Sequence, residues 1–293
     1  MAEKQRIGII GVGLMGHGIA RSVLRHGFSL AFLQHPGNQP TDDLLAAGAR
    51  AAASGAALAA DVDVVILCVT GSPEVEDVLL RDDGVLAGLR PHTVVIDCST
   101  AMPSSTIRMA AAVEAAGGRF LDAPMTRTPK EAAEGRLNLL VGGDASLFAQ
   151  CRPLLASYAE NIVHAGPVGS GHTLKLLHNF VSLGFATVLA EAAACARRAG
   201  VDSGVLLQVL AHGGGGGVVL ERLRPFIESG DDSGFRFTIA NALKDMDYYT
   251  AMARELGAAR LTAEAIRQAF ALGAGAPAGS TVPTLIDCLA AGQ

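Results

Sequence analysis

The chain has 293 residues, a formal net charge of −5 at pH 7 and hydrophobic residues at 50% of its positions. The length suggests about two domains, the acidic balance argues against a nucleic-acid-binding protein, and the apolar content excludes a disordered chain. The polar N-terminus and the lack of a run of about 20 apolar residues argue against an export signal and a membrane span. The five cysteines lack the close spacing of zinc or redox sites, so we expect no metal site and a reducing, cytoplasmic location.

Short apolar runs alternate with helical patterns in the first half of the chain, which is typical of a mostly parallel sheet built from βαβ units. We therefore expect an α/β domain over residues 1–165. The predicted strands span 6–11, 29–33, 63–69, 93–97, 120–123 and 137–141, and the predicted helices between them span 17–26, 74–80 and 103–116.

The pattern changes at the glycine-rich segment 166–171, which has the composition of a linker. Beyond it we expect an all-helical domain over residues 166–293, with a long helix at 172–199. The shorter predicted helices span 203–212, 218–227, 239–256, 262–272 and 281–291, and the five consecutive glycines at 213–217 cannot hold a helix. Because the long helix is apolar over most of its surface, we expect a homodimer or homotetramer formed through this domain. Burial within one chain is the alternative.

A glycine-rich motif, Gly11-Val-Gly13-Leu14-Met15-Gly16, follows the first predicted strand and opens the first predicted helix. In this context the motif indicates a dinucleotide-binding Rossmann domain. Gly11 permits the tight turn, Gly13 lets the backbone approach a pyrophosphate, and Gly16 lets helix and strand pack closely. The alternative is a glycine-rich turn without a ligand.

The end of the second predicted strand bears on the choice of cofactor. The segment Gln34-His35-Pro-Gly-Asn38 carries neither a carboxylate for the ribose of NAD nor an arginine for the 2′-phosphate of NADP. Gln34 and Asn38 can donate to either cofactor, and His35 can assist a phosphate. These residues lean towards NADP, and NAD is also compatible with them. An ordinary exposed turn histidine is the alternative for His35.

Polar residues also lie at the ends of two other predicted strands. Val69-Thr70 and Ser99-Thr100 come at the carboxyl edge of the sheet, where open α/β sheets bind ligands. The alternative for Ser99 and Thr100 is that they cap the helix at Pro103, and the alternative for Val69-Thr70 is a loop that only turns the chain.

Lys175, His178 and Asn179 share one face of the long helix by their spacing. A desolvated lysine can exchange a proton with a substrate hydroxyl near neutral pH, and the adjacent amide can position that hydroxyl. We therefore expect this face to point into a cleft between the domains. A solvated helix start with a lysine that extends into water is the alternative.

Together these motifs resemble the β-hydroxyacid dehydrogenase family, which includes 3-hydroxyisobutyrate dehydrogenases and tartronate semialdehyde reductases. The resemblance covers nearly the whole chain. It rests on residues 11–16, Asp97-Cys-Ser-Thr100 with Pro103, Asp122-Ala-Pro124, residues 135–143, Gly169-x-Gly-x-x-x-Lys175-x-x-x-Asn179, and Lys244-Asp245.

The resemblance implies a role for several of these residues. Lys175 would be the catalytic acid/base and Asn179 a substrate ligand. Ser99 and Thr100 would lie where nicotinamide and substrate meet, and Lys244 would reach the cofactor with Asp245 beside it.

The loop Met125-Thr126-Arg127-Thr128-Pro-Lys departs from the small residues that are commoner in the family. It looks more like the loop of sulfolactaldehyde reductases, which carry an Arg-Thr pair there. Arg127 offers a bidentate fork to an anion, so we expect Thr126, Arg127 and Thr128 to contact the substrate. An ion pair of Arg127 with Glu131 or Glu134 is the alternative.

His178 is the second departure, because a Lys-x-x-His-Asn run looks like 6-phosphogluconate dehydrogenase. That decarboxylating relative needs a glutamate three residues after the asparagine, where this chain has Ser182. We therefore expect reversible hydride transfer between NADP or NAD and a short anionic 3-hydroxy acid or its semialdehyde, without decarboxylation. The alternatives are a sulfolactaldehyde-type or tartronate semialdehyde-type reductase and, less compatible with Lys175, an imine reductase or a non-catalytic dinucleotide-binding protein.

Overall fold

The computed structural model describes residues 4–291, and the chain divides into two compact units, residues 1–175 and 176–293. The predicted boundary at residue 165 lies before the long helix α9 (Ser170–Arg198), whereas this division falls within α9. The difference has a physical cause, because the start of α9 is hydrogen-bonded to the sheet of the first unit. The backbone N–H of His172 donates to the Asp122 carboxylate at 2.9 Å. The first turn of α9 is therefore part of the α/β unit.

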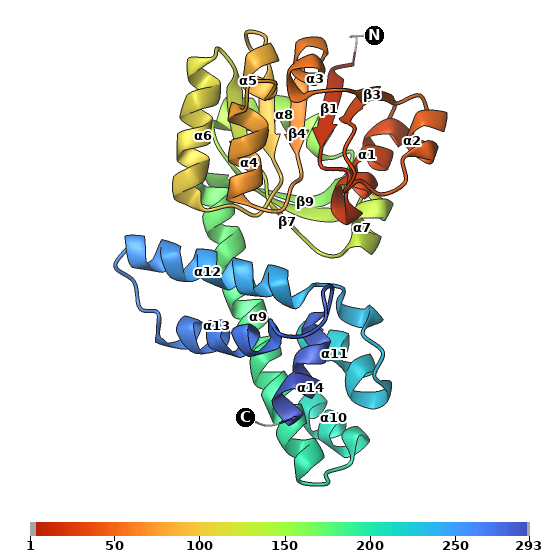
Figure 1. Ribbon diagram of the computed structural model, residues 1–293, viewed down its shortest axis with the longest axis vertical. Coiled ribbons are helices and arrows are strands. Elements are labelled where there is room, and N and C mark those ends of the chain that lie inside the picture. Colours follow the sequence, from red (N-terminus) through yellow and green to blue (C-terminus); the bar gives the residue numbers. More distant parts are fainter. Residues whose placement is uncertain (1–3, 292–293) are drawn as a thin grey trace. The chain divides into compact units, whose positions relative to one another are not determined.

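The first unit is built on a nine-stranded sheet in the order β3-β2-β1-β4-β5-β6-β8-β7, with β9 paired to β8 (Figure 1). The pairs from β3 to β6 are parallel, β8 is antiparallel to β6 and β7, and β9 is parallel to β8. This order confirms the predicted Rossmann architecture. The strands are β1 (Arg6–Ile10), β2 (Ser29–Leu33), β3 (Arg50–Ala52), β4 (Val64–Leu67), β5 (Val94–Asp97), β6 (Arg119–Asp122), β7 (Met125–Thr126), β8 (Leu137–Gly142) and β9 (Ala159–Gly166).

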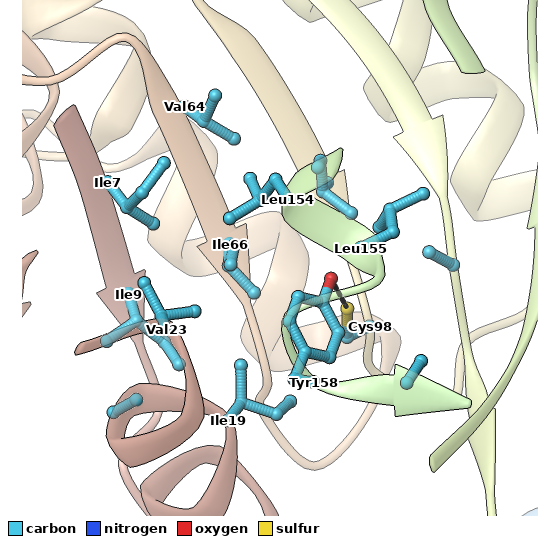
Figure 2. Packing of buried hydrophobic residues seen from close by; sticks show 14 of the residues in the cluster. Ile7, Ile9, Ile19, Val23, Val64, Ile66, Cys98, Leu154, Leu155 and Tyr158 are labelled. Carbon is cyan, nitrogen blue, oxygen red and sulfur yellow. Dashed lines mark hydrogen bonds between the residues drawn. The ribbon is translucent and has the colours of Figure 1, made fainter. Parts of the chain in front are cut away.

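Successive residues of the central strands enter two different cores, because side chains alternate across a sheet. On β4, Val64 and Ile66 belong to one cluster, and Val65 and Leu67 belong to the other. Helices α1 (Leu14–Arg25) and α8 (Ala145–Leu155) cover the first cluster, and α3 (Gly55–Asp61), α4 (Ser72–Leu80) and α6 (Pro103–Ala115) cover the second. Figure 2 shows the first cluster, where the Tyr158 hydroxyl lies 3.8 Å from Cys98 Sγ. Full burial of each valine, leucine or isoleucine side chain in these clusters stabilises the fold by roughly 1.5–3 kcal/mol.

Three strands, β3, β7 and β9, are absent from the predicted set. β3 has three residues and β7 has two, too few for a periodic pattern, and most side chains of β9 are exposed or half-buried. The helices α2 (Asp42–Ala46), α3, α5 (Val85–Gly88), α7 (Pro129–Glu134) and α8 also lie outside the predicted set. Most of these elements carry too few buried apolar residues to leave a hydrophobic signal. Helix α8 is different, because it buries four apolar residues but contains Pro153, which is atypical of a helix interior.

The second unit is helical from α9 to the last described residues. It contains α10 (Ser203–His212), α11 (Val218–Ser229), α12 (Ile239–Glu255), α13 (Leu261–Gly273), α14 (Leu285–Ala290) and the 3₁₀ turns η1 (Ser233–Phe235) and η2 (Val282–Thr284). The prediction of one helix over 281–291 is wrong in its first turn, because Pro283 lies in η2 and α14 begins at Leu285. In the glycine run, Gly217 has a positive φ of 138° and precedes α11. A residue with a side chain would be strained there.

Helix α9 is long and apolar enough, by length and composition alone, to cross a membrane. The core helix of a globular domain passes the same test. Leu176, Leu183 and Leu189 of α9 are buried within the protein.

Helix α1 packs closely on α7 through Gly18, and this contact is testable. A Cβ at Gly18 would lie 2.6 Å from the carbonyl carbon of Ala132, closer than van der Waals contact allows. Alanine would gain about 1 kcal/mol of helix propensity over glycine, but the backbone of α7 would have to move. We expect Gly18→Ala to lower the free energy of unfolding by about 1–3 kcal/mol. Gly214→Ala is the matched control, because its Cβ would meet nothing within 4 Å. Equal stability of the two variants in chemical denaturation would contradict this packing.

Candidate functional site

The glycine-rich loop between β1 and α1 has little room for side chains on its inner surface. Gly11 has a φ of 94°, and a Cβ there would lie 2.2 Å from the Cys68 carbonyl oxygen. A Cβ at Gly16 would lie 1.9 Å from the Gly11 carbonyl oxygen, whereas one at Gly13 would meet nothing within 4 Å. Gly13 is the N-cap of α1, and its open side therefore faces free space at a helix N-terminus, where backbone N–H groups and the helix dipole favour a phosphate. These residues fit a dinucleotide pyrophosphate, and Leu14 and Met15 begin the helix beside it.

The loop after β2 is tied to the glycine-rich loop by Asn38. Its Oδ1 accepts the Val12 N–H at 3.2 Å, and its Nδ2 donates to the Leu33 carbonyl at 2.9 Å. Gln34 and His35 are exposed at the end of β2. The His35 Nδ1 accepts the Gly37 N–H at 3.0 Å, so the neutral ring carries its proton on Nε2, where it can donate to a ligand.

The ends of β4 and β5 are joined by Ser99. Its hydroxyl oxygen accepts the Val69 N–H at 3.1 Å, and its own N–H donates to Asp97 Oδ1 at 2.9 Å. Ser99 is buried, Val69 and Thr100 are half-buried, and Thr70 is exposed. The alternative in which Ser99 or Thr100 caps the helix at Pro103 is wrong, because Met102 is the N-cap of α6 and no side chain caps it.

Lys175 reaches the loop that follows β6. Its half-buried side chain donates from Nζ to the Met125 carbonyl at 2.7 Å. Next in that loop, the Thr126 hydroxyl accepts from Asn138 Nδ2 at 3.0 Å. The structure therefore brings the predicted acid/base residue to the predicted substrate loop.

Arg127 and Thr128 have partners within the protein. The Arg127 guanidinium donates to the Glu160 carboxylate at 2.5 Å and to the Arg136 carbonyl, and its backbone has a positive φ of 83°. This ion pair holds the pKa of Glu160 below its usual value. Thr128 and Glu131 form the capping box of α7. The alternative, an ion pair of Arg127 with Glu131 or Glu134, is wrong in its partner, because Glu131 caps α7 and Glu134 pairs with Arg136.

In the second unit, a polar chain connects α9 to α12. Asn179 Nδ2 donates to Asp245 Oδ2 at 2.6 Å, Lys244 Nζ lies 3.0 Å from Asp245 Oδ1, and His178 Nδ1 lies 3.1 Å from Asn179 Oδ1. Asn179 and Asp245 are buried, and His178 is exposed. The structure therefore groups the polar residues that the sequence placed in this unit, with Asp245 as their centre.

A buried cluster of His172, Asp97 and Asp122 has no role in the sequence-based site. Asp97 and Asp122 are opposite each other in register at the ends of β5 and β6, and His172 comes from the first turn of α9. All three side chains are fully buried. Desolvation raises the pKa of Asp97, and the nearby His172 opposes that shift. The sequence did hold a signal for this cluster: an aspartate at or next to the end of two predicted strands, 93–97 and 120–123, and a histidine one turn before Lys175.

Two family models together match most of the chain. The NAD-binding domain of 6-phosphogluconate dehydrogenase matches residues 6–166, and the NAD-binding region of NADP-dependent 3-hydroxyisobutyrate dehydrogenase matches residues 169–282.

Curated relatives and a solved structure are also similar. An NAD-dependent L-serine dehydrogenase of Pseudomonas aeruginosa is 34% identical over 274 residues, which cover 92% of this chain and 89% of the relative. A 3-hydroxyisobutyrate dehydrogenase of the same organism is 32% identical over 277 residues, covering 92% and 88%. The solved 3-hydroxyisobutyrate dehydrogenase of Mycobacterium tuberculosis with L-serine superposes with a TM-score of 0.86 at 26% identity, covering 98% and 99%.

The glycine-rich loop yields a paired prediction. A Cβ at Gly13 enters open space, so Gly13→Ala should fold with an unchanged melting temperature, but it should weaken NADH and NADPH binding about tenfold or more by blocking the pyrophosphate. Gly16→Ala should instead lower stability, because its Cβ would overlap the Gly11 carbonyl. Fluorescence titration and thermal unfolding measure the two effects. Unchanged binding in a folded Gly13→Ala variant would contradict the assignment of the loop.

Proposed function

Since the chain belongs to the β-hydroxyacid dehydrogenase family and is an NAD(P)-dependent oxidoreductase, we propose that it interconverts a short anionic 3-hydroxy acid and its semialdehyde. The observation that carries this proposal is the half-buried Lys175, whose Nζ donates a hydrogen bond to the carbonyl of Met125, the first residue of the loop 125–128. The relatives named for L-serine and 3-hydroxyisobutyrate make these two acids the first substrates to test.

The proposed mechanism assigns the proton to Lys175. A bound nicotinamide would accept the hydride in oxidation and return it in reduction. In oxidation, the neutral Lys175 amine takes the proton of the substrate hydroxyl, and in reduction the ammonium returns it to the forming alkoxide. The hydrogen bond to the Met125 carbonyl holds Nζ at the loop that follows β6. Asn179 lies one turn further along α9 and is proposed to orient the hydroxyl, with Ser99 and Thr126 holding the anionic end.

The proposed reaction ends at the semialdehyde. Decarboxylation in the 6-phosphogluconate dehydrogenase type of site needs an acid three residues after the asparagine. Here Ser182 occupies that position. A serine hydroxyl is a poor proton donor near neutral pH, so hydride transfer is the whole proposed reaction.

We propose NADP as the preferred cofactor, with NAD also used. No carboxylate at the end of β2 would repel a 2′-phosphate, and the exposed His35 can donate to it from Nε2. No arginine is present there to make the preference strong.

Replacement of Lys175 tests the function directly. The oxidation of 3-hydroxyisobutyrate, L-serine, D- and L-glycerate, threonate and 3-hydroxypropionate is followed at 340 nm with NADP and NAD separately. We expect Lys175→Met to lower kcat by about 10²–10⁴-fold on the best substrate, because the proton acceptor is lost, while the Kd for NADPH stays within about twofold. Lys175→Arg is the control that keeps the charge but cannot lose its proton. Wild-type turnover in Lys175→Met would contradict the assignment.

The sulfolactaldehyde-type alternative depends on Arg127. Its ion pair with the exposed Glu160 is weak enough for an anion to displace, since exposed ion pairs contribute about 0–1 kcal/mol. Arg127→Gly should raise the KM for the anionic substrate about tenfold, and glycine suits the positive φ of this position. Glu160→Gln, which releases Arg127, should lower that KM.

The substrate panel then separates the classes. Oxidation of dihydroxypropanesulfonate that is lost in Arg127→Gly would favour a sulfolactaldehyde-type enzyme, and reduction of tartronate semialdehyde would favour that class of reductase. An unchanged KM for every substrate in Arg127→Gly would show that Arg127 does not contact the substrate and serves only its contacts to Glu160 and Arg136.

We also propose a cytoplasmic homodimer or homotetramer formed through the helical unit, without nucleic-acid or membrane partners. The support is a set of exposed valines on two helices, Val181 and Val188 on α9 and Val205 and Val209 on α10. We expect Val181→Lys/Val188→Lys to shift the mass in size-exclusion chromatography with light scattering towards the 30.0 kDa monomer. Leu261→Lys on α13 is the control, because Leu261 is 90% exposed and lies outside this set. A monomeric wild type would refute the assembly.

A further inference from the structure

His172 lies between two carboxylates in the interior of the first unit. Its Nε2 is 3.9 Å from Asp97 Oδ2, and its Nδ1 is 3.8 Å from Asp122 Oδ2. The exposed fraction of all three side chains is 0%. The proposed mechanism uses none of these groups, although His172 precedes Lys175 by one turn of α9.

The hydrogen bonds of His172 constrain its protonation. Nε2 is 3.1 Å from the Ser99 carbonyl oxygen, which can only accept, so Nε2 carries a proton. Nδ1 is 2.8 Å from the Thr106 hydroxyl, and that hydroxyl is also 3.0 Å from the Met102 carbonyl. The single hydroxyl proton of Thr106 can serve only one of these two acceptors. When it serves Met102, Nδ1 must also carry a proton, and the ring is an imidazolium.

The carboxylates favour this doubly protonated ring. Asp122 accepts the backbone N–H of Gly169 at 2.8 Å and that of His172 at 2.9 Å, and such bonds stabilise the ionised form. Asp97 Oδ1 accepts the Ser99 N–H, and its Oδ2 has no hydrogen-bond partner among residues 4–291. Burial disfavours the charge on Asp97 and raises its pKa, and a positive charge on His172 opposes that shift, so an ionised Asp97 depends on the imidazolium.

The neighbouring titratable groups that interact with Asp97 are neutral thiols. Burial raises the pKa of Cys68, at the end of β4, to about 12, and it also raises the pKa of Cys98, which follows β5. From α6, Thr106 contributes only its hydroxyl. The cluster of one imidazolium and two carboxylates therefore has a net charge of −1.

We propose that His172 is a positioning residue, held as an imidazolium by Asp97 and Asp122, that fixes the Ser99 loop against the turn of α9 carrying Lys175. This inference rests on the proposed role of Lys175. It also has an electrostatic consequence. Loss of the His172 charge would leave two uncompensated carboxylates near Lys175, whereas loss of the Asp97 charge would leave none in excess.

The opposite signs of these two changes provide the test. The oxidation rate should rise with pH as Lys175 loses its proton. His172→Gln should move the midpoint of that rise upwards by roughly 0.5–1 pH unit and lower kcat about tenfold, and Asp97→Asn should move the midpoint downwards. Thr106→Val removes a hydrogen bond but no charge, and should leave the midpoint unchanged. A merely structural defect would lower kcat or stability in all three variants without opposite pH shifts.

A second measurement does not depend on turnover. In ¹⁵N-histidine-labelled wild-type protein, both ring nitrogens of His172 should be protonated near pH 7.5, with Thr106→Val confirming the assignment of the signal. A spectrum with one protonated ring nitrogen overturns the proposal, as does a common direction of the pH shift in His172→Gln and Asp97→Asn. If the wild type oxidises no hydroxy acid, the proposed function fails, and this spectrum still decides the charge of His172. If His172→Gln does not fold, Asp97→Asn and the spectrum carry the test.

Discussion

The pair of hydrogen bonds that Asp122 accepts from the backbone of Gly169 and His172 determines where helix α9 begins. A helix start has N–H groups without partners inside the helix and a positive dipole end, and one carboxylate at the end of β6 satisfies both. The approach is too close for any side chain at Gly171, where a Cβ would lie 2.2 Å from the Leu140 carbonyl oxygen. The sheet therefore sets the position of Lys175 by way of the backbone, and a flexible lysine side chain is delivered to the Met125 carbonyl from a fixed origin.

The same edge of the sheet holds buried polar groups above an apolar interior. The strands β1, β4 and β5 are buried on both faces by the two hydrophobic clusters, so water cannot reach the polar groups at their ends through the sheet faces. They are paired with one another instead, as Ser99 is with Val69 and Asp97. These pairings restrain the edge, because a polar group that moved would leave its buried donor or acceptor without a hydrogen bond.

The central parallel strands, the glycine-rich loop and the long helix with Lys175 were predictable because each has a local signal. Runs such as Val64–Leu67 are continuous and apolar, and Gly11, Gly13 and Gly16 follow a strand. The contacts that needed the register of the sheet were not predictable. The burial of His172 follows only once Asp97 and Asp122 are opposite each other, and the pairing of Arg127 with Glu160 needs β9, a strand with few buried side chains. Thr128 is different, since its spacing to Glu131 is a capping-box pattern that was present in the sequence and assigned to substrate contact. The contact of Thr128 with substrate therefore remains a proposal.

The anchoring of the loop 125–128 at both ends has a consequence for how such proteins diverge. Met125 and Thr126 are paired to β8, and Thr128 is fixed by its capping box to α7, so the fold constrains the chain on either side of Arg127. Position 127 itself has a positive φ and a side chain directed to the surface residue Glu160, and the core does not depend on it. A lineage can therefore exchange the residue at this one position without first acquiring compensating mutations in the core. Duplicated copies of such a gene would be expected to differ at this position before they differ in the elements that hold the loop.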